Sequence, residues 1–233
     1  MAVAAVLLDF YGTLARATHW LSADDVLAEH GYTLPAEARE RWFNEGLDGI
    51  EHLEQSRSRE HYVAWQQERT LAMLAETDVH PDEYETIIEK LRKGATQRVL
   101  EAYSEVPYAL AALRERGVRL AICSNWDWDL AEAVDDAGLS EFFDVLVSSA
   151  WAGARKPHPR IFRRTLRELA VEPSACVFVG DTWGPDVEGP TAVGIPAVYL
   201  RRPGHWDDPG APREVGHRVL AVLPDLGGLP DLL

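Results

Sequence analysis

The chain has 233 residues, of which 46% are hydrophobic and 26% are charged, and its formal net charge at pH 7 is −15. This composition is typical of a globular protein, and the length suits one large domain or a domain with an insertion. Because nucleic-acid binding depends on neutralising phosphates, we expect no general nucleic-acid partner, although a small cationic site can still bind a small anion.

The apolar stretches and the cysteines indicate which cellular settings and which covalent links to expect. No apolar run approaches the ~20 residues that a membrane span needs, and no basic leader precedes the apolar start. We therefore expect no membrane partner, no signal peptide and a cytoplasmic protein. Cys123 and Cys176 both lie in apolar runs and match neither a disulfide framework nor a metal spacing, so we expect small core residues. The sequence does not indicate an oligomeric state.

Short apolar runs predict a buried parallel sheet, because they are continuous rather than alternating, as in strands covered on both faces. The predicted strands are Val3–Leu8, Val118–Cys123, Val145–Ser148, Cys176–Val179 and Ala197–Leu200. Helical patterns lie between the later strands, over residues 108–117, 129–138 and 158–170. This alternation predicts an α/β fold, a Rossmann-like doubly wound sheet with its functional residues at the carboxyl ends of the strands.

The segment between the first two predicted strands does not follow this alternation of strands and helices. From about residue 16 to residue 102 we find no convincing strand, and the patterns indicate helices over residues 22–31, 35–55, 59–76 and 80–94. Ser22 is a good N-cap for the first of them. So long a stretch is not a crossover loop, and we expect an inserted all-helical subdomain.

Four polar clusters follow or adjoin the predicted strands. They are Asp9, Tyr11 and Thr13 in DFYGT, Ser124 with Asn125, Lys156 in RKPHP, and Asp181 with Asp186 in GDTWGPD. Because the carboxyl ends of parallel strands meet at one edge of a sheet, we expect these clusters to lie together.

The residue types in these clusters suit phosphoryl transfer. A carboxylate such as Asp9 can act as a nucleophile if its charge is neutralised. Two further acids, Asp181 and Asp186, are reasonable neighbours if a divalent cation lies among them, and hard oxygen ligands suit Mg²⁺. Lys156 then supplies a counter-charge, and Ser124 can hold anionic oxygens. Positioning and charge stabilisation are what phosphoryl transfer requires.

In this order and spacing, the four clusters resemble those of the haloacid dehalogenase (HAD) superfamily of aspartate-nucleophile hydrolases, over nearly the whole chain. The helical insertion resembles the type 1 cap of that family. The resemblance implies a core of residues 1–15 and 103–233, a helical cap of residues 16–102, and Mg²⁺-dependent hydrolysis of a small phosphate monoester through an aspartyl-phosphate on Asp9. It also implies that Ser124 and Lys156 hold the transferred group. The implied metal site comprises Asp9, the backbone carbonyl of Tyr11, Asp181 and Asp186, the last through water or a hydrogen bond.

Tyr11 departs from the family pattern. Phosphatases of this family usually have an aspartate there, which protonates the leaving oxygen and then activates water, and such help is worth ~10²–10⁴-fold. A phenol donates a proton but is a poor base near neutral pH. Tyrosine at this position resembles the 2-haloacid dehalogenases, which need neither metal nor leaving-group acid.

The fourth motif favours the phosphatase interpretation. The dehalogenases carry Ser and Asn where this chain has Asp181, and an extra uncompensated carboxylate in a metal-free site would be costly. Two alternatives stay open: a metal-independent 2-haloacid dehalogenase-like hydrolase, and a catalytically impaired binding protein of the same fold.

Substrate contacts are predicted for Asn125, Arg16 and Trp126. Arg16 lies just past the first motif, where a surface salt bridge is an equal alternative. Tryptophans near the motifs either cover the loops and the seam between cap and core or stack on a flat substrate; these are Trp20, Trp126, Trp128, Trp151 and Trp183. His19 and His158 have no ligand spacing, and we assign them no metal.

Overall fold

A parallel sheet forms the centre of the protein, which we describe from a computed structural model covering residues 3–43, 47–204, 208, 210–212 and 219–233. Six strands are hydrogen-bonded in the order β5-β4-β1-β6-β7-β8, all parallel. Their bounds are Ala5–Leu8 (β1), Arg119–Ser124 (β4), Val145–Ser148 (β5), Cys176–Gly180 (β6), Ala197–Leu200 (β7) and Ala221–Leu223 (β8). The chain runs from β1 outward through β4 to β5 and then returns to β6 on the other side of β1. Ligands bind where the strand order reverses in this way, so the site is expected at the carboxyl ends of the strands around β1.

All five predicted strands are present, and the α/β doubly wound architecture is confirmed. The sequence did not predict β8, because this edge strand has only three residues and Val222 is 42% exposed, so it forms no buried apolar run.

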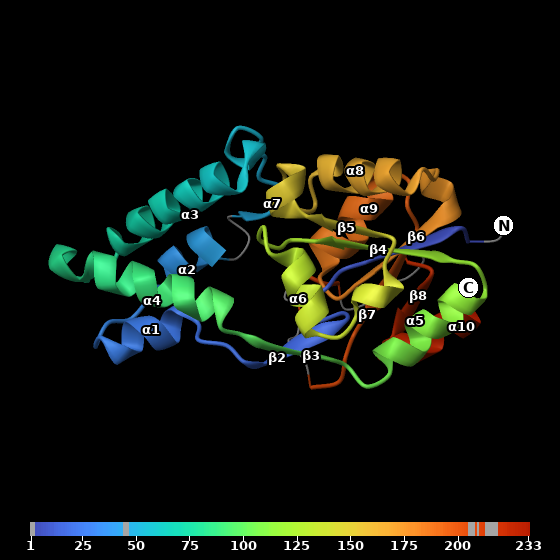
Figure 1. Cartoon of the computed structure of the whole chain (residues 1–233), viewed down its shortest axis with the longest axis horizontal. Coiled ribbons are helices and arrows are strands. Elements are labelled where there is room, and N and C mark those ends of the chain that lie inside the picture. Colours follow the sequence, from blue (N-terminus) through green and yellow to red (C-terminus); the bar gives the residue numbers. More distant parts are fainter. Residues whose placement is uncertain (1–2, 44–46, 205–207, 209, 213–218) are drawn as a thin grey trace.

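Alternate residues of each central strand face opposite layers of helices. Leu8 and Ile122 pack with α5 (Val106–Glu115), α6 (Leu130–Asp136) and α10 (Leu229–Leu232), and Leu7 and Phe178 pack with α8 (Pro159–Leu169). Figure 1 shows α8 and α9 (Gly189–Ala192) on one side of the sheet and α5, α6 and α10 on the other. Burying each such Leu or Phe side chain stabilises the fold by about 1.5–3 kcal/mol, which explains the continuous apolar runs.

A group of four helices, which we call the cap, stands beside the sheet (Figure 1). The helices are α1 (Ala23–Glu29), α2 (Ala36–Phe43), α3 (Arg59–Leu74) and α4 (Tyr84–Thr96). They share a small core of their own that includes Leu27, Leu74 and Ile87. Ser22 caps α1 as predicted, in a capping box with Asp25. The helix predicted over residues 35–55 is shorter than expected, ending at Phe43, and residues 44–46 lie outside the described part.

The expectation that residues 16–102 contain no strand is wrong. β2 (Ala15–His19) and β3 (Val99–Ala102) pair antiparallel as a two-stranded ribbon that joins the cap to the sheet core (Figure 1). β2 is largely exposed and polar, and its stability comes from a partner at the far end of the insertion. No local pattern reports such a pairing, because a short, solvated strand has no apolar periodicity.

Shorter turns complete the chain. Single 3₁₀ turns lie at Gln55–Arg57 (η2), Pro81–Glu83 (η3), Ser140–Phe142 (η4), Pro173–Ala175 (η5) and Leu226–Gly228 (η8). A π-helical turn, η6 (Gly184–Glu188), follows β6, and α7 (Ser149–Ala152) follows β5. Among the described residues, no helix combines the length and the apolar character needed to cross a bilayer.

Candidate active site

Asp9 directly follows β1 and begins a tight turn at the edge of the sheet. Its backbone N–H donates to the carbonyl of Val179 at 2.9 Å, which continues the pairing of β1 with β6. The chain then reverses, with the N–H of Leu14 donating to the carbonyl of Phe10 at 2.8 Å. Gly12 adopts a φ of 84°, a left-handed conformation that favours glycine. The DFYGT sequence therefore holds the Asp9 side chain at the strand end.

The Asp9 carboxylate is held by two donors from other elements. Its Oδ1 accepts hydrogen bonds from Ser124 Oγ, at the end of β4, at 2.8 Å and from Lys156 Nζ at 2.6 Å. Asp9 is only 7% exposed. Burial raises its pKa, and the charge of Lys156 opposes that shift. The structure thus brings together Asp9, Ser124 and Lys156, as predicted from three separate motifs.

Lys156 is fixed through its backbone as well as its side chain. Asn125 Oδ1 accepts from the backbone N–H of Lys156 at 2.6 Å, and Asn125 Nδ2 donates to the Lys156 carbonyl at 3.1 Å. Nζ of Lys156 forms a second ion pair with Asp186 Oδ1 at 2.6 Å. Both ends of the Asn125 amide thereby hold the lysine, a role the sequence did not reveal.

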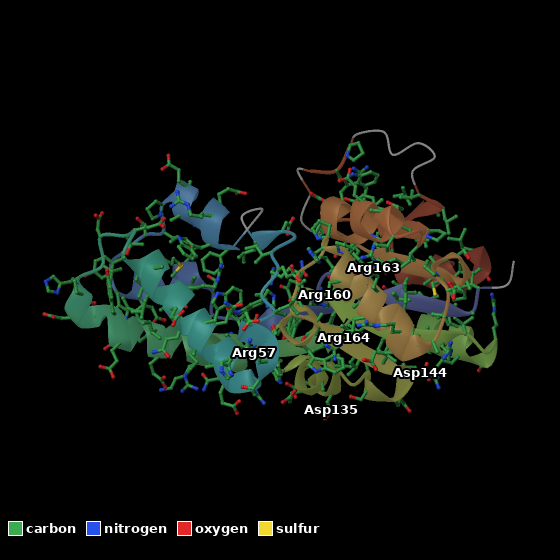
Figure 2. All side chains as sticks on the ribbon, turned by 90° about the horizontal axis from the view of Figure 1, so that it is seen from above. Arg57, Asp135, Asp144, Arg160, Arg163 and Arg164 are labelled. Atoms are coloured by element: carbon green, nitrogen blue, oxygen red, sulfur yellow. The ribbon has the colours of Figure 1, made fainter. Side chains whose placement is uncertain are left out.

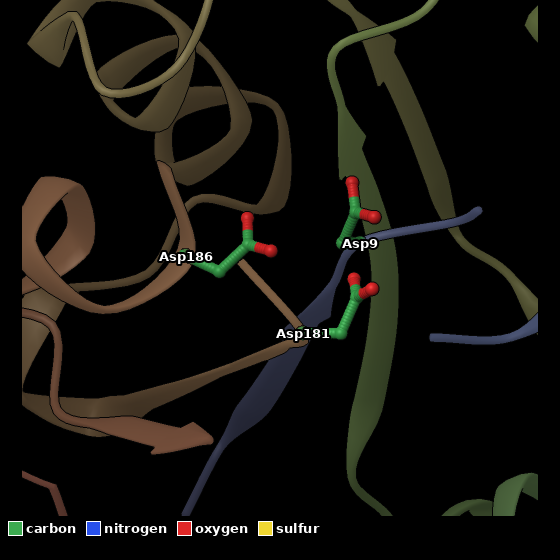
Figure 3. Close-up of side chains that lie close together, drawn as sticks. All are labelled: Asp9, Asp181 and Asp186. Carbon is green, nitrogen blue, oxygen red and sulfur yellow. The ribbon is translucent and has the colours of Figure 1, made fainter. Parts of the chain in front are cut away.

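Three carboxylates, which we call the carboxylate cluster, gather beside this lysine. Oxygen atoms of Asp9, Asp181 and Asp186 lie within 4.8 Å of one another (Figure 3). Asp181 Oδ1 accepts from Thr13 Oγ1 at 3.2 Å, and Asp186 Oδ2 accepts from the N–H of Thr182 at 3.0 Å.

Gly180, the last residue of β6, makes room for the carboxylate cluster. A Cβ placed there would lie 2.4 Å from the carboxyl carbon of Asp186, so a side chain would displace this carboxylate. No local pattern distinguishes Gly180, because a glycine at the end of a strand resembles any other turn signal.

The electrostatics of the cluster favour a bound cation. Burial raises the pKa of Asp186 to about 8 even though Lys156 opposes the shift. For Lys156, burial alone would lower the pKa, but the charges of Asp186 and Asp9 raise it. One lysine does not balance three carboxylates, and oxygen donors are what a hard divalent cation such as Mg²⁺ prefers. The residues therefore fit the predicted magnesium site.

Tyr11 lies in a group of aromatic side chains. Its ring contacts Trp20 edge-to-face, with centroids 5.4 Å apart, and lies 6.4 Å from the ring of Trp126. Trp126 is 8% exposed and packs edge-to-face on Phe10 at 5.1 Å. Its indole N–H donates to Asp129 Oδ1 at 3.1 Å.

The remaining predicted substrate contact, Arg16, lies on the ribbon of β2 and β3. Its guanidinium carbon is 5.8 Å from the centroid of the Tyr103 ring. The guanidinium carbon of a second arginine, Arg202, lies 3.7 Å from the centroid of the same ring. Arg202 also donates to the carbonyls of Gly12 and Thr13 at 3.1 and 2.7 Å. Arg202 thus braces the turn that follows Asp9, and nothing near it in the sequence indicates this contact.

The other tryptophans are spread over different surroundings. Trp183 is 3% exposed and packs on Tyr199 with centroids 5.5 Å apart. Trp151 is 38% exposed and carries the guanidinium of Arg164 over its ring. The rings of Trp128 and of Tyr62 on α3 have centroids 6.0 Å apart, at the seam between the cap and the core.

Known proteins share this sequence pattern. A family model described as haloacid dehalogenase-like hydrolase matches residues 3–194. Haloacid dehalogenase-like hydrolase domain-containing protein 3 of Homo sapiens is 32% identical over 203 residues, covering 84% of this chain and 76% of that protein. A phosphoserine phosphatase of Thermus thermophilus is 37% identical over 110 residues, which cover 47% of this chain and 44% of that protein.

The fold is shared with solved structures as well. The crystal structure of a predicted phosphoglycolate phosphatase from Haemophilus somnus has a TM-score of 0.69 at 19% identity, covering 98% of this chain and 97% of that chain. The alignments to the Mus musculus and Bos taurus forms of domain-containing protein 3 span only 39% and 48% of those proteins.

Proposed function

Because the chain belongs to the haloacid dehalogenase-like hydrolases, whose family model matches residues 3–194, we propose that it hydrolyses a small organic phosphate monoester with Mg²⁺ as its cofactor. The observation that carries the proposal is the carboxylate cluster around the buried Lys156. This arrangement has a nucleophile, a counter-charge and an acidic cation site in one place. The phosphoserine phosphatase among its relatives supports the same reaction class.

Asp9 is the nucleophile of the proposed reaction. Its carboxylate oxygen attacks phosphorus, the new oxygen–phosphorus bond forms, and the bond to the leaving oxygen breaks. Ser124 and Lys156, already in contact with Asp9, orient the carboxylate and stabilise the negative charge of the transferred group. Water then attacks phosphorus, which releases inorganic phosphate and restores the Asp9 carboxylate.

Asp9, Asp181, Asp186 and the backbone carbonyl of Tyr11 would hold the metal, Asp186 through water or a hydrogen bond. When bound, Mg²⁺ neutralises the charge of phosphoryl oxygens in such sites. Asn125 acts as a positioning residue in this proposal, because both ends of its amide hold the backbone of Lys156. Substrate contacts by Arg16 and Trp126 stay predictions, as does the division into a core of residues 1–15 and 103–233 and a cap of residues 16–102.

Tyr11 is proposed to protonate the leaving oxygen. Its phenol is a weak base, so activation of water in the second step is expected to be slow compared with phosphatases that carry an aspartate there. A metal-independent dehalogenase is less compatible with the site, because Asp181 and Asp186 would then add buried negative charge without a cation.

The test is a panel of phosphate monoesters and 2-haloacids, each assayed with Mg²⁺ and with EDTA. We expect phosphate release that requires Mg²⁺ and disappears in Asp9→Asn, while Asp136→Asn, an exposed matched change on α6, keeps wild-type turnover. Halide release in EDTA would support the dehalogenase instead. Turnover by Asp9→Asn would rule out the nucleophile assignment, and no turnover on any compound would favour the impaired binding protein.

A further inference from the structure

Two arginines from distant parts of the chain, which we call the arginine pair, lie at the seam between cap and core, where the charges of both act on His52 and Tyr62. Arg69 belongs to α3 of the cap, and Arg155 immediately precedes Lys156. Burial, and then the positive charge of Arg155, lower the pKa of the Arg69 guanidinium. The two charges therefore repel each other in a partly desolvated setting.

Backbone pairing across the seam places Arg155. The N–H of Arg155 donates to the carbonyl of Ile50 at 2.9 Å, and the N–H of His52 donates to the carbonyl of Gly153 at 2.8 Å. This short antiparallel contact fixes the residue next to Lys156, whose side chain contacts Asp9. Arg155 thereby lies one residue from Lys156, whose side chain belongs to the proposed phosphoryl site.

Aromatic rings position the Arg69 guanidinium. Its central carbon lies 5.1 Å from the ring centroids of both Trp42 and Trp65. His52 stacks on Trp65, with centroids 4.9 Å apart and planes 26° from parallel. One N–H of the Arg69 Nη2 donates to the carbonyl of Trp42 at 3.4 Å. Rings that hold the faces of a guanidinium by cation–π contact leave the other N–H donors at its edge directed away from the rings. Burial lowers the pKa of His52 to about 4, so this ring is neutral at pH 7 and adds no charge of its own.

The arginine pair lacks the acidic partners found for other arginines in this acidic protein. Arg39, Arg98 and Arg202, for example, each form an ion pair with an Asp or Glu. Within the described residues, neither Arg69 nor Arg155 forms one, and Nε of Arg155 is buried without a hydrogen-bond partner.

A nearby acid is already occupied by neutral donors. Asp127, in the loop after β4, accepts from the hydroxyl of Tyr62 at 2.9 Å and from Nε2 of Gln66 at 3.2 Å. Two partly buried like charges without a counter-ion are costly, and a bound anion removes that cost.

We propose that Arg69 and Arg155 bind a second anionic group of the substrate, so that the preferred substrates are phosphate monoesters that also carry a carboxylate or a second phosphate. This inference rests on the proposed function, because it adds a selectivity site to the same reaction. The guanidinium groups act as fork-shaped donors to the oxygens of that group, and Trp42 and Trp65 hold the Arg69 guanidinium in place.

Binding of matched phosphonates tests the arginine pair without any turnover. Phosphonoacetate and ethylphosphonate differ by a carboxylate in place of a methyl group, and a bisphosphonate with an ethylene spacer provides the second-phosphate arm. Calorimetry on the full chain, with and without Mg²⁺, should show about 10- to 100-fold tighter binding of phosphonoacetate or the bisphosphonate, which carry a second anionic group, than of ethylphosphonate. That ratio should fall at least about 10-fold in Arg69→Gln and in Arg155→Gln.

The controls are Arg41→Gln on α2 and Arg163→Gln on α8, two exposed arginines whose loss changes the net charge equally (Figure 2 shows Arg163 on α8). Both should keep the wild-type ratio. Equal affinity of the wild type for all three phosphonates would overturn the proposal, as would a ratio that Arg69→Gln and Arg155→Gln leave unchanged.

Turnover separates this inference from the proposed function. Phosphoglycerate and glycerol phosphate form a matched ester pair, and the preference for phosphoglycerate should be lost mainly through KM in Arg69→Gln. Hydrolysis of both esters at equal kcat/KM would refute the arginine pair alone. Failure to hydrolyse any ester, with the phosphonate preference intact, would refute the phosphatase proposal and support the anion site.

Discussion

Replacing Lys156 with methionine tests whether the buried positive charge of this lysine stabilises the carboxylates around it and supports turnover. Lys156 is 1% exposed, and its Nζ lies 2.6 Å from an oxygen of Asp9 and 2.6 Å from an oxygen of Asp186. Methionine has a similar length and fits an apolar wall that includes the ring of Phe178, so the change removes charge rather than packing. It leaves two buried carboxylates without their cation.

The magnitude follows from the cost of breaking a buried ion pair, about 3–5 kcal/mol. For a chain of this size, 1 kcal/mol shifts Tm by about 2–4 °C, so Lys156→Met should lower Tm by roughly 6–20 °C. Turnover should fall by at least ~10²-fold, because a preorganised donor to the transferred group is lost. The loss of stability should be larger at pH 8 than at pH 5, where Asp9 and Asp186 take up protons more readily.

Thermal unfolding followed by circular dichroism, together with phosphate release under Mg²⁺, measures both effects. Lys90→Met is the matched control, because Lys90 is 40% exposed and pairs with Glu29 at the surface of the cap, where such pairs contribute about 0–1 kcal/mol. If Lys156→Met unfolds within about 2 °C of the wild type at pH 8 and keeps its turnover, the buried counter-charge contributes neither to stability nor to catalysis.

Three further predictions concern the same edge of the sheet. Without metal, wild-type stability should fall as pH rises from about 4 to about 8. Burial raises the pKa of Asp186 to about 8 in the folded protein, so the stability that is present below its unfolded pKa is lost as the folded carboxyl group deprotonates. Urea titrations across this range should show the loss, and Mg²⁺ should restore stability most at pH 8. Tyr11→Asp should raise kcat by about 10- to 100-fold for alkyl phosphates, because an aspartate can both protonate the leaving oxygen and then activate water. The gain should be smaller for nitrophenyl phosphate, whose leaving group needs no proton, and equal rates of variant and wild type in a stopped assay would show that the acid–base steps are not limiting. Gly180→Ala should cost about 1–3 kcal/mol in urea unfolding and weaken Mg²⁺ binding, because its Cβ would overlap Asp186; Gly184→Ala, where a Cβ meets open space, should do neither.

The sequence by itself determined the central strands and the motif residues that follow them. Parallel strands covered on both faces must be apolar throughout, so β1 and β6 are visible as continuous runs that end at Asp9 and just before Asp181. Chain order then predicts that these aspartates share one edge of the sheet with Lys156, as the structure shows. Local sequence was sufficient here because each motif is attached to the end of a buried element.

Only the tertiary structure decided which groups meet across distant segments. The pairing of β2 with β3, the hold of Asn125 on the Lys156 backbone and the contact of Arg69 with Trp42 all join residues far apart in the chain. Exposed strands and long polar side chains leave no periodic pattern, and the same arginine can pair with a surface acid or face another arginine. Partner choice at such positions depends on the packing of cap against core, which local propensity does not encode.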